Sequence, residues 1–316
     1  MLRHPRVVTI TFDDDPDAGT MQDFADWIVT SDWLAATGGE YGVGAGTNQR
    51  VQHAAVAARI TDHDIRQWLA DMPATGDVYV WLLGPGARMD GTCGYHDELA
   101  IGSRRVPYIV VPNCPGATVR GLTPLEYRQG RASHELIEAF TDPLPTSAPG
   151  YAFRDPDRLW TSTYGEVSDL CVWNYLPFAA ASGATFYAQR SWSNAAAALG
   201  GDPCVPRPAG LGYFNVRATP AFPAAAPGHT VTVTLDGWTD GSPHSPWTLQ
   251  WQTSAWNDFD PSPALSAQTI SDGGSATVTL HVPATATPGQ RASIAIISDD
   301  SHTNSLWPIA VRCTQP

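Results

Sequence analysis

Thr123-Pro-Leu-Glu-Tyr-Arg-Gln-Gly-Arg-Ala-Ser-His-Glu-Leu-Ile-Glu-Ala-Phe-Thr-Asp-Pro143 is the stretch around which the chain is organised. It predicts a helix, because Thr123 is a good N-cap, Pro124 suits the first helical position and Glu126 completes a capping box three residues after the cap. Apolar residues then recur at steps of three and four, which gives the helix one stripe for a core. Since Pro143 bars continuation, we expect the helix to end near Asp142.

Two side chains of this helix are placed to bind one metal ion. His134 and Glu138 are four residues apart, so they lie one above the other on the same face. Glu135 stands about a quarter turn away. Further along, Gly165-Glu166-Val167-Ser168-Asp169 supplies two more carboxylates. A metal site needs a third ligand, and Glu166 is the natural one.

The spacing resembles the zinc-protease helix His-Glu-x-x-His. The run His-Glu-Leu-x-x-Ala-x-Thr-Asp, with its downstream carboxylates, is similar to the thermolysin-like, or gluzincin, class of metallopeptidases. That resemblance implies a zincin-like domain in which His134, Glu138 and Glu166 bind one Zn²⁺, Glu135 is the general base and Asp169 orients His134. The sequence departs from the class because Glu138 replaces the second histidine, and because Glu166 precedes Asp169 by three residues instead of four.

A second resemblance covers more of the chain. It rests on four segments, Cys93–His96, Ser133–Pro143, Gly165–Cys171 and Trp192–Asn194, which are similar to the secreted phosphate-induced, or EXORDIUM-like, proteins. This similarity implies a secreted protein with a His-Glu-x-x-Glu core, and no particular reaction. We expect His96 in a loop, either as a free histidine or, as the minority interpretation, in contact with substrate or metal.

The ligand set leaves the role of the ion open. Two carboxylates and one imidazole neutralise a divalent ion more fully than two imidazoles and one carboxylate, so they acidify water less. The ion could be catalytic or purely structural, and His134 could also be an ordinary core histidine. In a catalytic site, Tyr164 or Tyr151 could donate a hydrogen bond to an oxyanion.

Length and charge narrow the class of protein. A chain of 316 residues predicts two domains, each with its own core. The net charge is −13 and all 18 basic residues are arginines, which argues against nucleic acid or anionic membrane as a partner. No apolar run is long enough to span a membrane, and the first residues lack the apolar core of a signal peptide.

The five cysteines indicate the compartment. Cys93 with Cys114 and Cys171 with Cys204 fall as two pairs along the sequence, and no Cys-x-x-Cys spacing is present. Disulfides are the favoured use, which implies an oxidising, extracytoplasmic setting, although sequence alone does not fix their connectivity. The alternative is a set of buried free thiols in a cytosolic protein.

The first part of the chain mixes predicted helices and strands. The hydrophobic patterns predict strands at Arg6–Phe12, Asp77–Leu83 and Val106–Val111. They predict helices over Met21–Leu34 and Thr61–Met72.

After Cys204 the composition changes to Pro- and Gly-rich, and five apolar or alternating segments follow. They predict an immunoglobulin-like β-sandwich over residues 213–316, after a metal domain over residues 1–205. Trp238, Trp247, Trp251, Trp256 and Trp307 could form a platform for sugar stacking, although such residues more often belong to a core or interface.

The predicted fold class is therefore α+β, a zincin-like metal domain followed by an all-β immunoglobulin-like sandwich. The predicted function is that of a secreted metal-dependent hydrolase, a zinc metallopeptidase acting on peptide or protein. One alternative is a non-catalytic protein with a structural ion that binds extracellular glycan or cell wall through the sandwich. A carboxylate-pair glycosidase is the third hypothesis.

Overall fold

The computed structural model describes residues 1–56, 59–114, 119–150, 166–241, 244–254 and 257–315. The chain divides into two compact units, Met1–Ala152 with Tyr175–Ser193, and Phe153–Asn174 with Asn194–Pro316. Each unit is built from two separate segments of the chain. The predicted domains, 1–205 and 213–316, instead treat each domain as one continuous segment.

The first unit is built on a five-stranded sheet in the order β2-β1-β3-β5-β4. The pairs β1–β2, β1–β3 and β3–β5 are parallel, whereas β4 runs antiparallel to β5. The central strands are apolar on both sides, as expected for parallel strands covered on both faces. The sheet strands are β1 (Arg6–Phe12), β2 (Thr47–His53), β3 (Val78–Leu82), β4 (Tyr95–Ile101) and β5 (Arg104–Val111).

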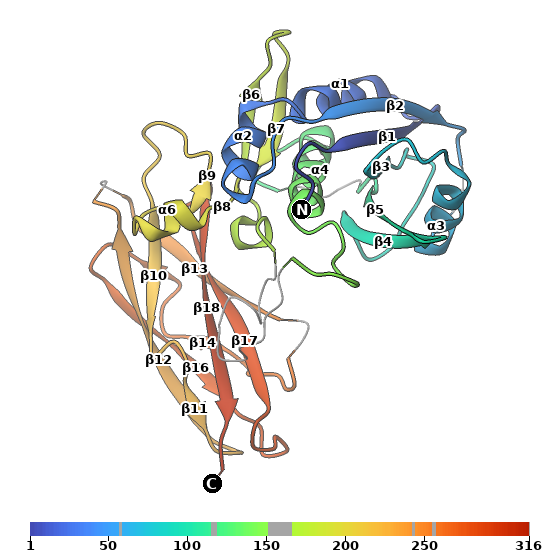
Figure 1. Cartoon of the computed structure of the whole chain (residues 1–316). Coiled ribbons are helices and arrows are strands. Elements are labelled where there is room, and N and C mark those ends of the chain that lie inside the picture. The colour runs from blue at the N-terminus through green and yellow to red at the C-terminus, as the bar shows by residue number, and fades with distance from the viewer. Residues whose placement is uncertain (57–58, 115–118, 151–165, 242–243, 255–256, 316) are drawn as a thin grey trace. The chain divides into compact units, whose positions relative to one another are not determined.

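Helices cover both faces of this sheet (Figure 1). One face packs against α1 (Ala18–Ile28) and α4 (Pro124–Thr141), and the other packs against α3 (Asp62–Asp71). The remaining elements of the unit are α2 (Asp32–Gly38), the short helix η1 (Gly39–Tyr41), the hairpin β6 (Tyr175–Ala179) with β7 (Thr185–Gln189), and β8 (Ser191–Trp192).

Helix α4 forms where the sequence predicts it. Thr123 Oγ1 accepts a hydrogen bond from the backbone N–H of Glu126, and the Glu126 carboxylate accepts one from the N–H of Thr123, which is a complete capping box. Pro124 occupies the first turn and Asp142 is the C-cap. Every residue of the second half of the helix is buried, so its polar side chains there face the protein interior.

The predicted fold class is wrong. The described residues contain more strand than helix, 36% against 20%, and the strands lie in several sheets. The prediction of a zincin-like α+β domain with an immunoglobulin-like sandwich was carried over from one helix motif and from strand periodicity. Neither signal specifies how strands pair, and in the first unit the pairing gives a largely parallel sheet with helices on both faces.

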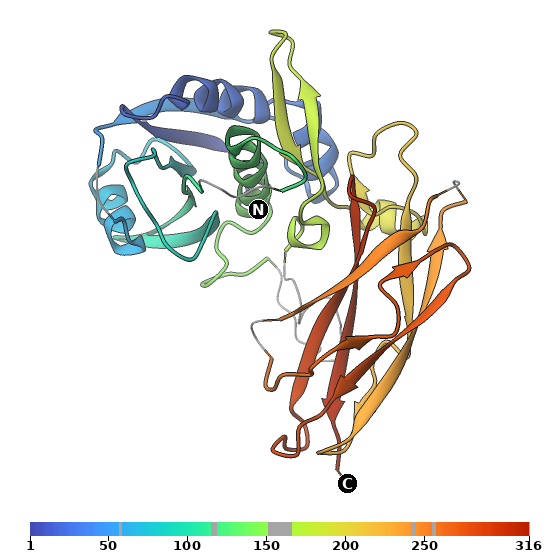
Figure 2. The same cartoon turned by 180° about the vertical axis from the view of Figure 1, so that it is seen from behind.

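The second unit contains two larger sheets, in the orders β10-β12-β16-β14 and β11-β18-β17-β13-β15. Alternate residues of both sheets contribute to one apolar core (Figures 1 and 2). The strands are β9 (Cys204–Val205), β10 (Phe214–Thr219), β11 (Ala224–Ala225), β12 (Thr230–Thr239), β13 (Trp247–Thr253), β14 (Ala264–Leu265), β15 (Thr269–Ile270), β16 (Ser275–His281), β17 (Arg291–Asp299) and β18 (Asn304–Cys313). The helices are η2 (Asp169–Cys171) and α6 (Asn194–Ala198).

The predicted tryptophan platform does not assemble as a set. Trp247 is 1% exposed and belongs to the core between the two sheets, and Trp307 packs against that core. Trp251 is 43% exposed on β13, while Trp256 lies outside the described residues. Only part of the set is therefore available to a ligand.

Two disulfides are present. Cys93 bonds Cys114, and Cys171 bonds Cys204, which confirms that the cysteines are used in disulfides. Cys313 is a buried free thiol. Such bridges fit an oxidising compartment. Among the described residues, no helix combines the length and apolar character needed to cross a bilayer.

Candidate metal centre

The buried face of α4 carries the candidate site. His134, Glu135 and Glu138 offer one ligand atom each, all within 4.8 Å of one another. His134 Nε2 lies 3.1 Å from Glu138 Oε2, and the side chains are only 4% and 2% exposed. The helical spacing that predicted this pair has therefore brought an imidazole and a carboxylate into contact.

Strand β4 adds a second imidazole that the sequence analysis placed in a loop. His96 is the second residue of β4 and pairs with Ile109 of β5. Its Nδ1 lies 3.9 Å from Glu138 Oε2 and 3.6 Å from Glu135 Oε2, and its side chain is 4% exposed. The first unit thus presents two imidazole nitrogens around a single carboxylate oxygen of Glu138.

The position of the site follows from the sheet topology. Strands β1, β3 and β5 are parallel and end at the same edge, and antiparallel β4 begins there because Tyr95 pairs with Val110. His96 therefore stands at the carboxyl edge of the sheet. In open α/β sheets this edge is where ligands bind.

The electrostatics keep Glu135 ionised. Burial alone would raise its pKa, but the charges of His134 and Arg131 and the hydrogen bond of His96 outweigh burial and lower the pKa. Arg131, one turn earlier on α4, donates from Nη2 to Glu135 Oε1 at 2.7 Å. Burial would lower the pKa of Arg131, yet the Glu135 carboxylate raises it, so this guanidinium remains a cation.

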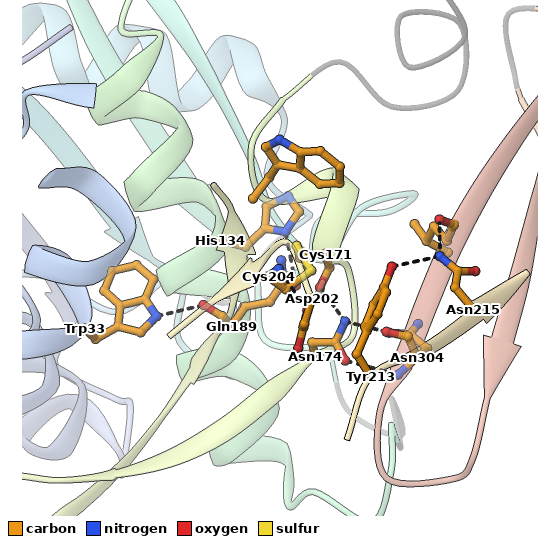
Figure 3. The surroundings of a disulfide bond; sticks show 12 residues. Trp33, His134, Cys171, Asn174, Gln189, Asp202, Cys204, Tyr213, Asn215 and Asn304 are labelled. Atoms are coloured by element: carbon orange, nitrogen blue, oxygen red, sulfur yellow. Dashed lines mark hydrogen bonds between the residues drawn. A yellow bond between two sulfur atoms is a disulfide. The ribbon is translucent and has the colours of Figure 1, made fainter. Parts of the chain in front are cut away.

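Gln189 at the end of β7 orients His134 (Figure 3). Its Oε1 lies 3.2 Å from His134 Nδ1, and its backbone carbonyl accepts a hydrogen bond from Trp33 Nε1 at 2.7 Å. Arg131 Nη1 lies 3.4 Å from the same imidazole nitrogen, so Gln189 is the closer partner. An amide oxygen at Nδ1 favours the tautomer that leaves Nε2 as the ligand atom, facing Glu138.

The Cys93–Cys114 bridge closes the open end of the β4–β5 hairpin, beside His96. Gly94 lies between the bridge and β4, and a Cβ atom placed there would stand 2.8 Å from Glu135 Oε1. A larger residue at this position would therefore require the Glu135 side chain to shift.

The predicted residues of the downstream segment do not belong to this unit. Glu166 and Asp169 lie within Phe153–Asn174, which belongs to the second unit, and Asp169 opens η2. Their roles as third ligand and as the group that orients His134 stay predictions. Tyr164 and Tyr151 lie outside the described residues.

The sequence analysis did not name Gln189, and it gave contact of His96 with substrate or metal only as the minority interpretation. The Cys-Gly-Tyr-His segment did draw attention to His96, but only strand pairing brings it to α4. No sequence pattern indicated Gln189, because its contact with His134 depends on the packing of β7 against α4. In that packing the Gln189 N–H donates to Ser133 Oγ at 2.8 Å.

Comparison with known proteins identifies no family. No family model matches, and no curated protein does either. Domains 4 and 5 of the S-layer protein SbsC share 13% identity over 33% of this chain and 54% of that chain, with a TM-score of 0.25. WR4, a C. elegans MSP family member, shares 11% over 32% of this chain and 97% of its own, with a TM-score of 0.23.

A family 123 glycoside hydrolase from Clostridium perfringens shares 14% identity over 30% of this chain and 22% of its own, with a TM-score of 0.21. All three TM-scores are too low to relate the whole fold. The comparisons therefore leave the function to be argued from the site itself.

Proposed function

We propose that this chain is a metal-dependent hydrolase of peptide bonds, with one zinc ion bound by His96, His134 and Glu138 and with Glu135 as general base. The observation that carries the proposal is the convergence of two imidazole nitrogens on Glu138 Oε2, at 3.1 and 3.9 Å, in a buried setting. Two ligand atoms on one tetrahedral zinc stand roughly 3.3 Å apart, given metal–ligand bonds of about 2.0–2.1 Å. The distances from Glu138 Oε2 to His134 Nε2 and to His96 Nδ1, 3.1 and 3.9 Å, lie on either side of this value.

The donor chemistry favours a transition ion. Two nitrogens and one carboxylate oxygen match zinc, whereas calcium takes six to eight oxygen ligands. Two carboxylates, Glu135 and Glu138, are buried side by side with side chains 4% and 2% exposed, and Arg131 is the fully charged group paired with Glu135. A divalent cation between these carboxylates fits the rule that buried charged groups are paired or coordinate metals.

With His96 as a ligand, the bound zinc is expected to be a stronger Lewis acid than with the ligand set predicted from the sequence. Two imidazoles and one carboxylate leave more charge on zinc than the predicted set of one imidazole and two carboxylates. Zinc in such a site polarises a carbonyl group and lowers the pKa of water. This ligand set supports a catalytic role more than a purely structural one.

Glu135 is the general base in the proposed reaction. It accepts a proton from water as the oxygen adds to the carbonyl carbon, and returns it to the amide nitrogen as the C–N bond breaks. The second proton of the water also passes to the leaving nitrogen, so the products are one carboxylate and one ammonium group, and atoms and protons balance. Arg131 holds the Glu135 carboxylate at 2.7 Å and so fixes its orientation.

The disulfides favour a secreted protein, since structural bridges persist outside the reducing cytosol. The proposed setting is therefore extracellular, with peptide or protein as substrate. Glycan binding through the second unit is an additional proposal, with the exposed Trp251 as its support.

The test combines metal analysis with a substrate screen. Protein produced under oxidising conditions is expected to contain about one zinc per chain by elemental analysis, and to cleave members of a peptide library in a chelator-sensitive manner. Absence of tight zinc uptake would overturn the metal centre. Tight zinc with no turnover on any peptide would replace the hydrolase by a binding protein with a structural ion.

Gly94→Ala is expected to lower turnover by roughly ten- to a hundredfold, as small displacements of catalytic groups do. The added Cβ would stand 2.8 Å from Glu135 Oε1, and the carboxylate, at the end of a flexible side chain, must move aside. Because little else must shift, Tm should change little. The matched control is Gly19→Ala on α1, where nothing lies within 4 Å of the added atom. Kinetics and thermal melts of both variants test this prediction. Full turnover in Gly94→Ala would show that the reaction does not depend on where the Glu135 carboxylate lies.

A further inference from the structure

A cavity of about 830 Å³ opens beside the candidate metal centre, entirely within the first unit. Its walls come from the β3–β4 connection, the end of β5 and the first turns of α4. This volume is within the range of small-molecule sites. The residues that line it are Met89, Asp90, Gly91, Thr92, Cys93, Gly94, Asn113, Cys114, Tyr127 and Arg131.

Arg131 connects this cavity to the site. It is the one positively charged residue among the described lining residues, and it also contacts Glu135 and His134. Its side chain is 14% exposed. Its Nε is buried and makes no hydrogen bond within the described part of the chain. A guanidinium has five N–H donors, so the contact with Glu135 leaves donors for a second partner.

The local charge favours an anion once the metal centre is loaded. Glu135, Glu138 and the lining residue Asp90 carry three negative charges, and Arg131 and Arg59, which lies 2.9 Å from Asp90, carry two positive ones. With the imidazoles neutral, as metal ligands are, the sum is −1. A divalent ion changes this sum to +1. A planar guanidinium in a cavity with net positive charge is suited to a carboxylate, which it binds through paired charge-assisted hydrogen bonds.

The spacing along α4 indicates which carboxylate fits. Arg131 and Glu135 are one turn apart on the helix, and Arg131 Nη2 lies 2.7 Å from Glu135 Oε1, so the guanidinium lies directly beside the proposed base. In a peptide, the C-terminal carboxylate carbon is three bonds from the carbon of the preceding amide carbonyl. That separation is roughly 3.5 Å, similar to the step between successive α-carbons. An anion held by Arg131 would therefore bring this amide bond next to Glu135.

We propose that the cavity is a carboxylate subsite, and that the substrates are peptides or acylated amino acids cleaved next to a free C-terminal carboxylate. This inference rests on the proposed hydrolase for the cleavage step, and on Arg131 alone for the recognition step. An aspartate side chain next to the cleaved bond has the same chemistry, so the test must separate the two sources.

The test measures binding, which needs no turnover. Zinc-loaded protein is titrated in a calorimeter with 3-phenylpropanoate and with its amide, which differ only in the carboxylate and lack the acyl-amide bond of the proposed substrates. The acid is expected to bind at least about tenfold tighter, as one charge-assisted contact provides. Arg131→Met should remove this difference, and Arg131→Lys should keep part of it. Arg104→Met, at an exposed position of the same unit, should keep it in full.

Each outcome decides a different point. If acid and amide bind equally, the carboxylate subsite is wrong. If Arg131→Met weakens both probes equally, Arg131 only positions Glu135, and the subsite is also wrong. If an N-acetylaspartate derivative with an amidated C-terminus binds as tightly as the acid, the assignment to C-terminal carboxylates is overturned.

The preference for the acid is separate from the proposed reaction. A protein that takes up no zinc and cleaves nothing, yet still prefers the acid through Arg131, would refute the hydrolase and support the subsite. With zinc removed by chelation, the acid should bind more weakly, because the divalent charge next to the guanidinium is lost.

Discussion

Glu135→Gln is expected to lower turnover on the best peptide substrate by a factor of about 100 or more, while zinc content stays near one per chain. General-base catalysis contributes about 10²–10⁴ to rate, and an amide cannot accept the proton. The Gln amide oxygen can still accept a hydrogen bond from Arg131 Nη2, so the local structure should persist. Steady-state kinetics, elemental analysis and a thermal melt on one preparation measure all three quantities.

The matched control is Glu126→Gln on the same helix. Glu126 closes the capping box at the start of α4 and lies away from the buried cluster, and glutamine serves that role as well as glutamate does. This variant should keep wild-type turnover and zinc. Unchanged turnover in Glu135→Gln would show that another group is the base, and a parallel loss of zinc would make Glu135 a ligand.

Local signals predicted the central helix accurately. The Thr123/Glu126 capping box and Pro124 depend only on neighbouring residues, so the start of α4 could be assigned from the sequence. The same holds for β1, which is rich in β-branched residues and buried on both faces after its first residue. By contrast, the predicted helix over Met21–Leu34 is two helices, because Ser31 caps the second by accepting a hydrogen bond from Leu34 N–H.

Strands whose formation depends on partners were harder to predict. β2 (Thr47–His53) is polar and half-exposed, so it has little alternation, and it forms because it pairs in register with the whole of β1. β10 (Phe214–Thr219) was not among the five predicted segments of the sandwich, although it pairs with β12. The parallel order of the first sheet is likewise a property of long-range pairing, which explains the wrong fold class.

The residues of the candidate site were predictable from the sequence only where they lie on one local element. His134, Glu135 and Glu138 lie on one helix, so their mutual placement follows from helical geometry. His96 reaches them only through the pairing of β4 with β5, and Gln189 only through the packing of β7 on α4. A ligand set drawn from one helix and its downstream segment was therefore incomplete.

His96→Ala is expected to raise the zinc dissociation constant at least about a hundredfold, because it removes one of three proposed ligands while His134 and Glu138 stay in place. The effect on stability follows by linkage. Zinc at about 100 times its wild-type dissociation constant stabilises the folded state by about 2.7 kcal/mol. In the variant the same concentration only equals the new constant, which leaves about 0.4 kcal/mol. Melts with and without zinc measure both values.

The control for this experiment is His63→Ala on α3, an exposed histidine whose ring contacts Gln67. It should keep the full zinc-dependent stabilisation. The metal-free proteins separate ligation from packing, since a histidine that only fills space would lower the stability of His96→Ala equally with and without zinc. If zinc stabilises His96→Ala as much as it stabilises the wild type, His96 is not a zinc ligand. The predicted set of His134, Glu138 and Glu166 would then be the next to test, with Glu166→Gln as the first variant.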